Sequence, residues 1–409
     1  METAQKQESY NINRLFYGSC FALITTAFSF SIRAGILPEL AETFDLTASQ
    51  LGTINSMWFL GFPITMIIGG LTYHTIGPKR FMQFAFLAHT VGIILTVYSG
   101  GYAGLILSTL LIGLGNGCTE AACNPMLADS SSGKRMSTLL NRFHMWFPGG
   151  IVLGSLIGYA MQQANLGWQA QIWILMIPTV IYAYMFYGQV FPKPKSQDAA
   201  SLMGNIRGMG SPLFLFIAVC MMFTAISEFG PTQWAQLVLA KSGAEPLLIM
   251  ALIFGIMAVG RYFGGEFVAK FDQTGVLLGS SVFTAIGIFL LATLTGSSVY
   301  LGAVVFAVGV CYFWPNMIGF VAEKVPSSGA LGMSVVGAIG MFFTGNLQPI
   351  IGRWIDAARE EALAMGLTGD ALELAAGQAT LKSLITFPLV LIVLFTILYV
   401  WVRKRRAAG

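Results

Sequence analysis

The sequence predicts an all-α integral membrane protein with 12 transmembrane helices in two pseudo-symmetric six-helix bundles. Three observations lead to this prediction. Of the 409 residues, 56% are hydrophobic and only 10% are charged, whereas soluble domains average about 25% charged residues. Lys and Arg gather in alternate loops. The two halves of the chain also resemble each other at an offset of roughly 195 residues, which is typical of duplicated membrane units.

Twelve apolar segments are long enough to cross a bilayer, which takes about 20 residues per helix. In chain order they cover approximately residues 15–40, 48–73, 81–99, 102–127, 143–162, 168–191, 212–237, 246–269, 275–295, 298–322, 328–351 and 380–402. Two connections are longer than the others. Residues 192–211 form a polar linker between an N-terminal bundle (1–191) and a C-terminal bundle (212–409). Residues 353–382 indicate a surface helix, a break at Gly366–Gly369, and a second helical turn or two.

The basic residues predict the orientation of the chain. If the N-terminus lies inside the cell, sixteen of the 22 Lys and Arg residues fall in cytoplasmic segments and four fall outside. Arg33 and Arg261 remain within predicted spans. By the positive-inside rule both termini are cytoplasmic, in a multi-pass plasma membrane protein of the bacterial inner-membrane type. The first span lacks a small-residue cleavage site, so we expect it to stay as an anchor.

The internal resemblance links particular spans. Asn124-Pro125 in the fourth span has its counterpart in Pro315-Asn316 of the tenth, and Arg33 in the first span falls opposite Glu228 in the seventh. Parallel repeats of this kind are found in secondary transporters, whose solute site lies near the bilayer midplane between the repeats. The pattern therefore indicates a transporter.

The motifs on these spans point to one family. The fourth span carries Glu120-Ala-Ala-Cys-Asn124-Pro125, and the later spans carry Ser227-Glu228, Gly260-Arg261 and Phe313-Trp314-Pro315. Together with the twelve-span layout, this sequence resembles the major facilitator superfamily, and within it the fucose/proton symporter family. Tyr73 stands where the superfamily's loop after the second span usually has Asp. The resemblance implies that spans one, four, seven and ten line a central cavity and that a proton gradient drives transport.

Ionisable residues at membrane depth are expensive and are functional candidates by default. We expect proton coupling to involve Glu120, Glu228 and Arg33. Arg33 is predicted to pair with one of the two carboxylates in at least one transport state, and Glu120 is the first candidate for the coupling carboxylate. An alternative is a purely structural ion pair between Arg33 and Glu120. Arg261 is assigned to gating, since the resemblance implies that charges near this point latch the closed state.

Amides and indoles near these charges form the candidate solute site, because sugar sites combine aromatic faces with amide hydrogen bonds. The predicted solute-binding residues are Asn116, Asn124, Gln233, Asn316, Asn346, Trp58, Trp234 and Trp314. The further gating candidates are Lys79 and Arg80 after the second span. The three histidines have no Cys or carboxylate partners at ligand spacing, so we predict no metal site.

The leading function is proton-coupled symport of a small polar solute, most simply a sugar. The alternatives are an organic-anion transporter, with Arg33 holding a carboxylate, and a multidrug exporter. The chain shows no nucleotide-binding loop and no catalytic cluster, so we expect neither ATP-driven pumping nor an enzyme. We expect no cofactor besides the ion gradient, with sodium left open. The expected partners are a small-molecule solute and the lipid bilayer, with no nucleic acid, and the protein is expected to be a monomer.

Overall fold

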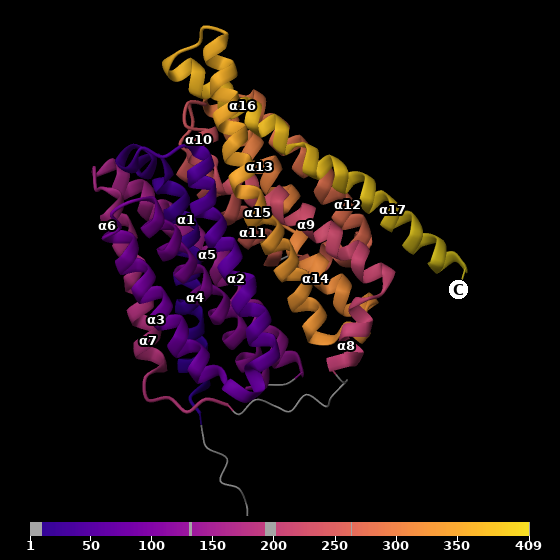
Figure 1. The fold of residues 1–409 in the computed structure, drawn as a ribbon. Coiled ribbons are helices and arrows are strands. Elements are labelled where there is room, and N and C mark those ends of the chain that lie inside the picture. Colours follow the sequence, from indigo (N-terminus) through magenta and orange to yellow (C-terminus); the bar gives the residue numbers. More distant parts are fainter. Residues whose placement is uncertain (1–9, 131–132, 193–201, 263, 409) are drawn as a thin grey trace, which may run out of the picture.

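A computed structural model describes residues 10–130, 133–192, 202–262 and 264–408, and these are helical nearly throughout (Figure 1). The helices of the first half are α1 (Ile12–Phe44), α2 (Ala48–Ile76), α3 (Pro78–Val97), α4 (Tyr102–Asp129), α5 (Gly133–Gln163), α6 (Trp168–Trp173) and α7 (Met176–Phe186). Those of the second half are α8 (Leu202–Met209), α9 (Pro212–Gln233), α10 (Ala235–Val238), α11 (Pro246–Tyr262), α12 (Gly264–Thr293), α13 (Val299–Val310), α14 (Phe313–Lys324), α15 (Gly329–Ala364), α16 (Gly369–Leu384) and α17 (Thr386–Ala408), with short 3-10 turns at Gly296–Ser298 and Pro326–Ser328.

The helices form two groups side by side, which confirms the predicted fold class. In Figure 1, α1–α7 make up one group and α9–α17 the other. Across the boundary α2 packs on α15, and α5 packs on α11. We call the end with α16 and the turn between α1 and α2 the hairpin end, and the end with α8 the linker end. The predicted linker falls partly on residues 193–201, outside the described part of the chain, and most of its remainder forms α8.

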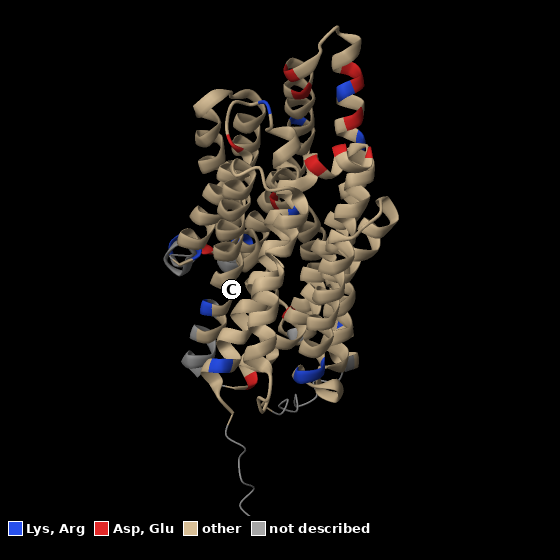
Figure 2. Ribbon diagram, turned by 90° about the vertical axis from the view of Figure 1, so that its left-hand side faces the viewer, with Lys and Arg blue, Asp and Glu red and all other residues tan. Residues whose placement is uncertain are grey.

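The predicted membrane spans correspond to these helices. In the described residues, ten helical segments are long and apolar enough to cross a membrane. The two other predicted spans fall on α11, an apolar helix of 17 residues, and on α5, whose first turns are polar in sequence. Figure 2 shows many of the acidic residues at the hairpin end, while basic residues gather toward the linker end.

The segment after the eleventh predicted span differs in part from the prediction. α15 continues to Ala364, and the chain then breaks as expected. The prediction of only a turn or two beyond the break is wrong, because α16 has 16 residues. Arg359 and Glu373 bridge the two helices with contacts of 2.8 and 3.1 Å, and Gly377 lets α16 approach the backbone of Val238 closely. This packing supports a full helix where sequence alone suggested a short one.

Small residues allow close contact between α1 and α5 inside the first group. A Cβ on Gly150 would lie 2.6 Å from the Cβ of Ala27, and one on Gly154 would overlap the Ser31 hydroxyl. Both glycines therefore face α1 from α5. Close approach through small residues is the usual way in which membrane helices associate, and here it holds α1 in place for the site described below.

Candidate functional site

Arg33 lies buried where the first group of helices meets the second. Its side chain comes from α1 and the residue is only 6% exposed. Nη2 donates a hydrogen bond of 2.8 Å to Oε1 of Gln233 in α9, and the guanidinium carbon lies 5.3 Å from the ring centre of Trp58 in α2. Within the described residues, Nε and Nη1 have no hydrogen-bond partner. A buried cation with two unused donors is suited to receive an anion.

A small cavity lies beside this guanidinium, inside the first group of helices. Its polar lining comes from Ser29, Arg33, Thr96 and Thr109, and its apolar walls come from Ile36, Leu40, Ile54, Leu105, Ile112, Ile172 and Leu175. The volume open to water is about 20 Å³, which is enough for about one water molecule. Arg33 therefore has a small, mainly apolar cavity on one side and the second group of helices on the other.

Two consecutive residues at a helix break make contacts in different directions. Gln233 bonds to α1 of the first group, and Trp234 bonds to α15 within the second group. α9 ends at Gln233, and Trp234 separates it from the short helix α10. Gln233 accepts from Arg33 and donates to the carbonyl of Phe30 over 3.3 Å. Trp234 donates through Nε1 to Oε1 of Gln348 in α15 over 2.8 Å. The break allows neighbouring side chains to point at two different helices, as broken helices do in many transporter sites.

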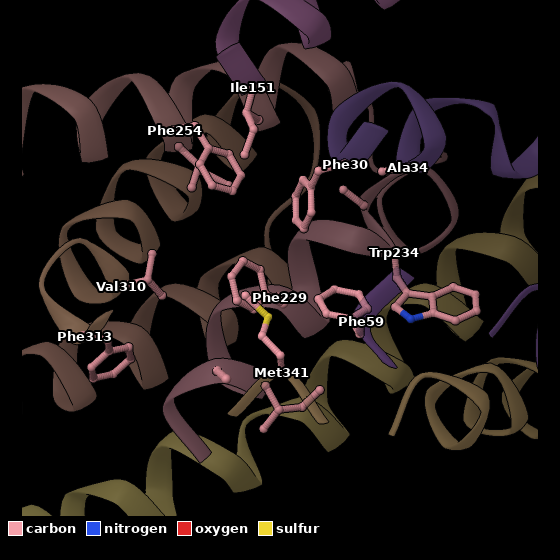
Figure 3. Packing of buried hydrophobic residues seen from close by; sticks show 14 of the residues in the cluster. Phe30, Ala34, Phe59, Ile151, Phe229, Trp234, Phe254, Val310, Phe313 and Met341 are labelled. Carbon is pink, nitrogen blue, oxygen red and sulfur yellow. The ribbon is translucent and has the colours of Figure 1, made fainter. Parts of the chain in front are cut away.

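An aromatic cluster closes the contact between the groups directly next to Arg33. The ring of Phe30 is fully buried, and its neighbours come from α2, α5, α9 and α11. The centroid distances run from 5.5 to 6.4 Å, to Trp58, Phe59, Phe147, Phe229 and Phe254. Figure 3 shows Phe30, Phe59 and Phe229 turned toward one another. Such edge-to-face packing excludes water, so it seals the protein at this level.

A second charged site lies within the other group of helices. Glu228 of α9 is 3% exposed, and its Oε1 lies 4.0 Å from Nη2 of Arg261. Arg261, at the end of α11, also donates through Nε to the carbonyl of Cys311 over 3.1 Å. Tyr312 donates back to the carbonyl of Gly260 over 2.9 Å. Among the described residues, the carboxylate thus faces the guanidinium of Arg261 at a distance too long for a hydrogen bond, and that guanidinium is held by the backbone between α13 and α14.

Glu120 of α4 lies next to Asn124, with which the sequence placed it on one helical stripe. It is half-buried, and it accepts a hydrogen bond from Asn124 one turn further along α4. In this conformation Arg33 pairs with neither Glu120 nor Glu228 among the described residues, and its hydrogen-bond partner is the neutral Gln233. Pairing with a carboxylate in another transport state stays a prediction. A neutral partner leaves the positive charge of Arg33 uncompensated, which makes the site more receptive to an anionic ligand.

The other predicted residues divide between buried and exposed positions. Trp58, Gln233 and Trp234 are fully buried at the contact between the groups. Trp314 is half-buried, with its ring 6.5 Å from Phe229, and the Nδ2 of the buried Asn316 has no partner among the described residues. Asn116 is buried inside the first group, where it forms hydrogen bonds with His89 and Ser29. Asn346, Lys79 and Arg80 are exposed, so they do not join the others.

Sequence reasoning missed the residue that joins the two groups at the hairpin end. Asp356 of α15 accepts the backbone N–H groups of Ala48 and Ser49, at 3.0 and 2.9 Å, and so caps the start of α2. A carboxylate is stabilised at a helix N-terminus by its free N–H groups and dipole. Gly52 and Gly352 bring the two backbones into contact here. The only sequence signal was an acidic residue within the segment interpreted as a surface helix.

Asp356→Ala is expected to open the hairpin end more often. Even one charge-assisted hydrogen bond is worth about 1.5–3 kcal/mol, so losing both should lower the ratio of closed to open molecules at least about tenfold. Spin labels at the exposed positions Ala164 and Glu245, on opposite groups, measure the separation by electron–electron resonance. Glu360→Ala, which removes an exposed carboxylate from the same helix, is the matched control. Unchanged distances in the Asp356 variant would contradict a latch.

The sequence profile of the Major Facilitator Superfamily matches residues 19–345. The chain is similar to the 3-(3-hydroxy-phenyl)propionate transporter of Escherichia coli (strain K12), with 22% identity over 63% of this chain and 64% of that protein, just under two thirds of its length. It is also similar to the hexuronate transporter of Bacillus subtilis (strain 168), with 23% identity over 77% of this chain and 80% of that one.

Solved structures show the same fold. A bacterial homologue of the human lysosomal transporter Spinster, in an inward-facing and unoccupied conformation, superposes with a TM-score of 0.78 at 16% identity, covering 94% of this chain and 96% of that chain. A D-xylose-proton symporter superposes with a TM-score of 0.73 at 15% identity, covering 93% and 97%. At these identities the likeness concerns the fold alone. The specific resemblance to the fucose/proton symporters is not confirmed by these comparisons.

Proposed function

The chain belongs to the major facilitator superfamily and is a secondary transporter of small solutes; on that premise, we propose that its solute is an organic anion whose carboxylate binds Arg33. The observation behind this proposal is the buried guanidinium with a neutral partner and two unused donors. A buried charge is costly unless it is paired, and a planar fork of N–H groups matches a carboxylate in two-point contact. An acid is therefore favoured over a neutral sugar.

The names of two relatives agree with this chemistry. A hexuronate and a hydroxyphenylpropionate are both carboxylates, although one is rich in hydroxyls and the other is aromatic. These names describe the solutes of those relatives. For this chain they support the organic anion, which sequence analysis held as the alternative, over the leading interpretation of a neutral sugar.

We propose that binding alternates with the contact between Arg33 and Gln233. In the structure the hairpin end is closed by Asp356 and the glycine contacts, and Gln233 occupies one edge of the guanidinium. When the groups of helices separate at that end, Gln233 moves away with α9 and a carboxylate can take its place. Closure returns Gln233 to Arg33. Gln233 then competes with the carboxylate of the solute, which favours release of the solute at the linker end. A ligand and a conformational change are then linked through one guanidinium.

Proton coupling is proposed for Glu228 with Arg261. A carboxylate 4.0 Å from a single guanidinium can be neutralised by that cation or by a proton, and the choice depends on where α9 and α11 lie. Glu120, the first candidate from sequence, is half-buried and bonded within its own helix. It stays the second candidate, and sodium as the coupling ion is the alternative to a proton.

Uptake into proteoliposomes tests the proposed function. The probes are glucuronate, 3-(3-hydroxyphenyl)propionate, glucose and xylose, each with and without an inward pH gradient, with sodium varied independently. We expect at least one acid to accumulate with the pH gradient and neither sugar to do so. Accumulation of a sugar with no uptake of either acid would contradict the proposal and would return the function to sugar symport.

The proposed orientation places the linker end in the cytoplasm of a bacterial inner-membrane protein, as the distribution of Lys and Arg predicts. Leu363 at the hairpin end is 59% exposed, and Arg403 of α17 is exposed. An impermeant maleimide is expected to label Leu363→Cys in intact cells and Arg403→Cys only after permeabilisation. The five native cysteines are buried, so the background is low. Equal labelling of both variants in intact cells would overturn this orientation.

A further inference from the structure

A chain of buried hydrogen bonds crosses the first group of helices behind Arg33. His89 of α3 is fully buried, although sequence analysis gave it no role. Its Nδ1 lies 3.0 Å from the hydroxyl of Tyr182 in α7, and its Nε2 lies 2.9 Å from Oδ1 of Asn116 in α4. Asn116 then donates through Nδ2 to the hydroxyl of Ser29 in α1 over 3.1 Å. Four helices are thus joined by one polar chain.

The chain ends at the ring that supports Arg33. Ser29 accepts a second hydrogen bond, 2.8 Å long, from Nε1 of Trp58, and its own proton goes to the carbonyl of Thr26 over 2.8 Å. The face of Trp58 lies against the guanidinium of Arg33. Trp58 is fully buried, so its indole N–H needs this acceptor, and losing it would leave a costly unpaired donor.

The direction of each bond follows from the groups involved. Because Ser29 accepts twice and donates to a carbonyl, Asn116 must donate to it with its amide nitrogen. The amide oxygen of Asn116 then faces His89, so Nε2 of His89 must carry a proton. Nδ1 is left to accept from Tyr182 when the ring is neutral. A single arrangement of protons satisfies every member, which makes the chain a rigid support.

We propose that His89 is a positioning residue for the anion site: acting through Asn116 and Ser29, it fixes the Trp58 ring and so the guanidinium of Arg33. This inference rests on the proposed binding of an organic anion by Arg33. Removing the Nε2 donor leaves the amide oxygen of Asn116 unpaired. The Asn116 side chain then becomes more stable when it turns toward other hydrogen-bond donors. Ser29 and Trp58 lose their fixed geometry, and Arg33 presents its fork to the carboxylate less accurately.

The space around His89 is shaped for this ring. A Cβ on Gly115 of α4 would overlap Cδ2 of His89 and approach Nε2 to 2.7 Å. Gly115 thus lets the imidazole lie directly against α4 beside Asn116. Gly115 makes room for the imidazole ring, and Oδ1 of Asn116 accepts the hydrogen bond from Nε2 of His89. Two neighbouring residues of α4 thus serve the same contact.

Two variants of His89 separate positioning from packing. His89→Leu removes both nitrogens, whereas the amide nitrogen of His89→Gln reaches near the place of Nε2 and can still donate to Asn116. The matched control is Thr179→Val. It removes a buried hydrogen bond of 3.3 Å between α7 and Thr25 of α1, in the same group of helices and outside this chain.

The first measurement is the concentration dependence of glucuronate and 3-(3-hydroxyphenyl)propionate uptake. His89→Leu is expected to raise the half-saturation concentration about tenfold, equivalent to leaving one buried group unpaired, with the maximal rate changed less than about twofold. His89→Gln should restore most of the loss, and Thr179→Val should resemble the wild type. An unchanged half-saturation concentration in His89→Leu, a loss confined to the maximal rate, or no rescue by glutamine would overturn the proposal.

A second measurement does not depend on any solute. Nitrogen-15 magnetic resonance of histidine-labelled protein in lipid resolves three histidines, and His89→Gln identifies the signal of His89. We expect a neutral ring protonated at Nε2, whereas protonation at Nδ1 would overturn the chain of bonds. Absence of acid uptake by the wild type would contradict the proposed function itself. Protonation of His89 at Nδ1 is a separate outcome, and it would contradict only the proposed role of His89 in positioning Arg33.

Discussion

Arg33→Gln is expected to raise the half-saturation concentration for organic-acid uptake about 100-fold or more. The guanidinium can give a carboxylate two charge-assisted hydrogen bonds, each worth about 1.5–3 kcal/mol, and tenfold in affinity corresponds to about 1.4 kcal/mol. Glutamine fills much of the volume and can still contact Gln233, but it offers no charge. The measurement is concentration-dependent uptake of the acid that the wild-type protein accumulates.

Two further variants make this result specific. Arg353→Gln removes an exposed arginine from α15 and should leave uptake unchanged. Arg33→Lys keeps the charge but loses the planar fork, so it should fall between the wild type and the glutamine variant. Near-normal uptake by Arg33→Gln, with the protein present in normal amounts, would show that Arg33 does not hold the solute.

Glu228→Gln is expected to abolish accumulation of solute driven by a pH gradient, while exchange between equally loaded compartments continues. Glutamine imitates the protonated carboxyl group, and solute exchange does not require the proton to leave. Accumulation, in contrast, requires solute and proton to change each other's affinity during each cycle. The measurement compares uptake against a concentration gradient with exchange of labelled for unlabelled acid in the same proteoliposomes.

Glu120→Gln is the informative counterpart, because Glu120 was the first candidate from sequence. Loss of accumulation in Glu120→Gln alone would transfer the coupling role to Glu120 and contradict the assignment to Glu228. Loss in both variants would indicate that two carboxylates share the proton. If both variants concentrate the acid normally, neither carboxylate couples transport to protons, and sodium becomes the ion to test.

The helical fold could be predicted because it follows from local properties of the chain. Segment length and apolar composition predict spans, and the family profile over residues 19–345 agrees. The one clear error concerned α16, whose 16 residues pack against α10 and pair with α15. Contacts between distant segments of this kind leave no periodic signal in a single sequence.

The charged residues of the candidate site could be predicted from the sequence, but their hydrogen-bond partners could not. Arg33 and Glu228 could be identified because any ionisable residue at membrane depth is unusual. Gln233 as the partner of Arg33 could not be identified, since the pairing depends on how α9 meets α1 across 200 residues of sequence. Asn346 and Gln348 illustrate the problem on one helix. They lie two positions apart and point about 200° apart around the axis, so Gln348 meets Trp234 and Asn346 is exposed.

His89 was missed for a related reason. A single histidine in an apolar span is ordinarily a satisfied core residue, and its value here comes from Asn116, Ser29 and Trp58 on three other helices. Its position opposite Gly115 is equally a matter of packing. The sequence contains each group, but the order in which they bond appears only in three dimensions.

Equilibrium binding of a matched pair of ligands to the purified protein tests the central claim most directly. Glucuronate and glucuronamide share the same hydroxyls and differ in the charge of one group. The same comparison can be made between 3-(3-hydroxyphenyl)propionate and its amide. For the acid that is transported, we expect binding to the wild type about 100-fold tighter than that of the amide, a difference of about 2.7 kcal/mol, and a nearly equal affinity of both for Arg33→Gln. Equal binding of acid and amide to the wild type, or a preference for the acid that survives in Arg33→Gln, would contradict the claim that Arg33 selects an organic anion.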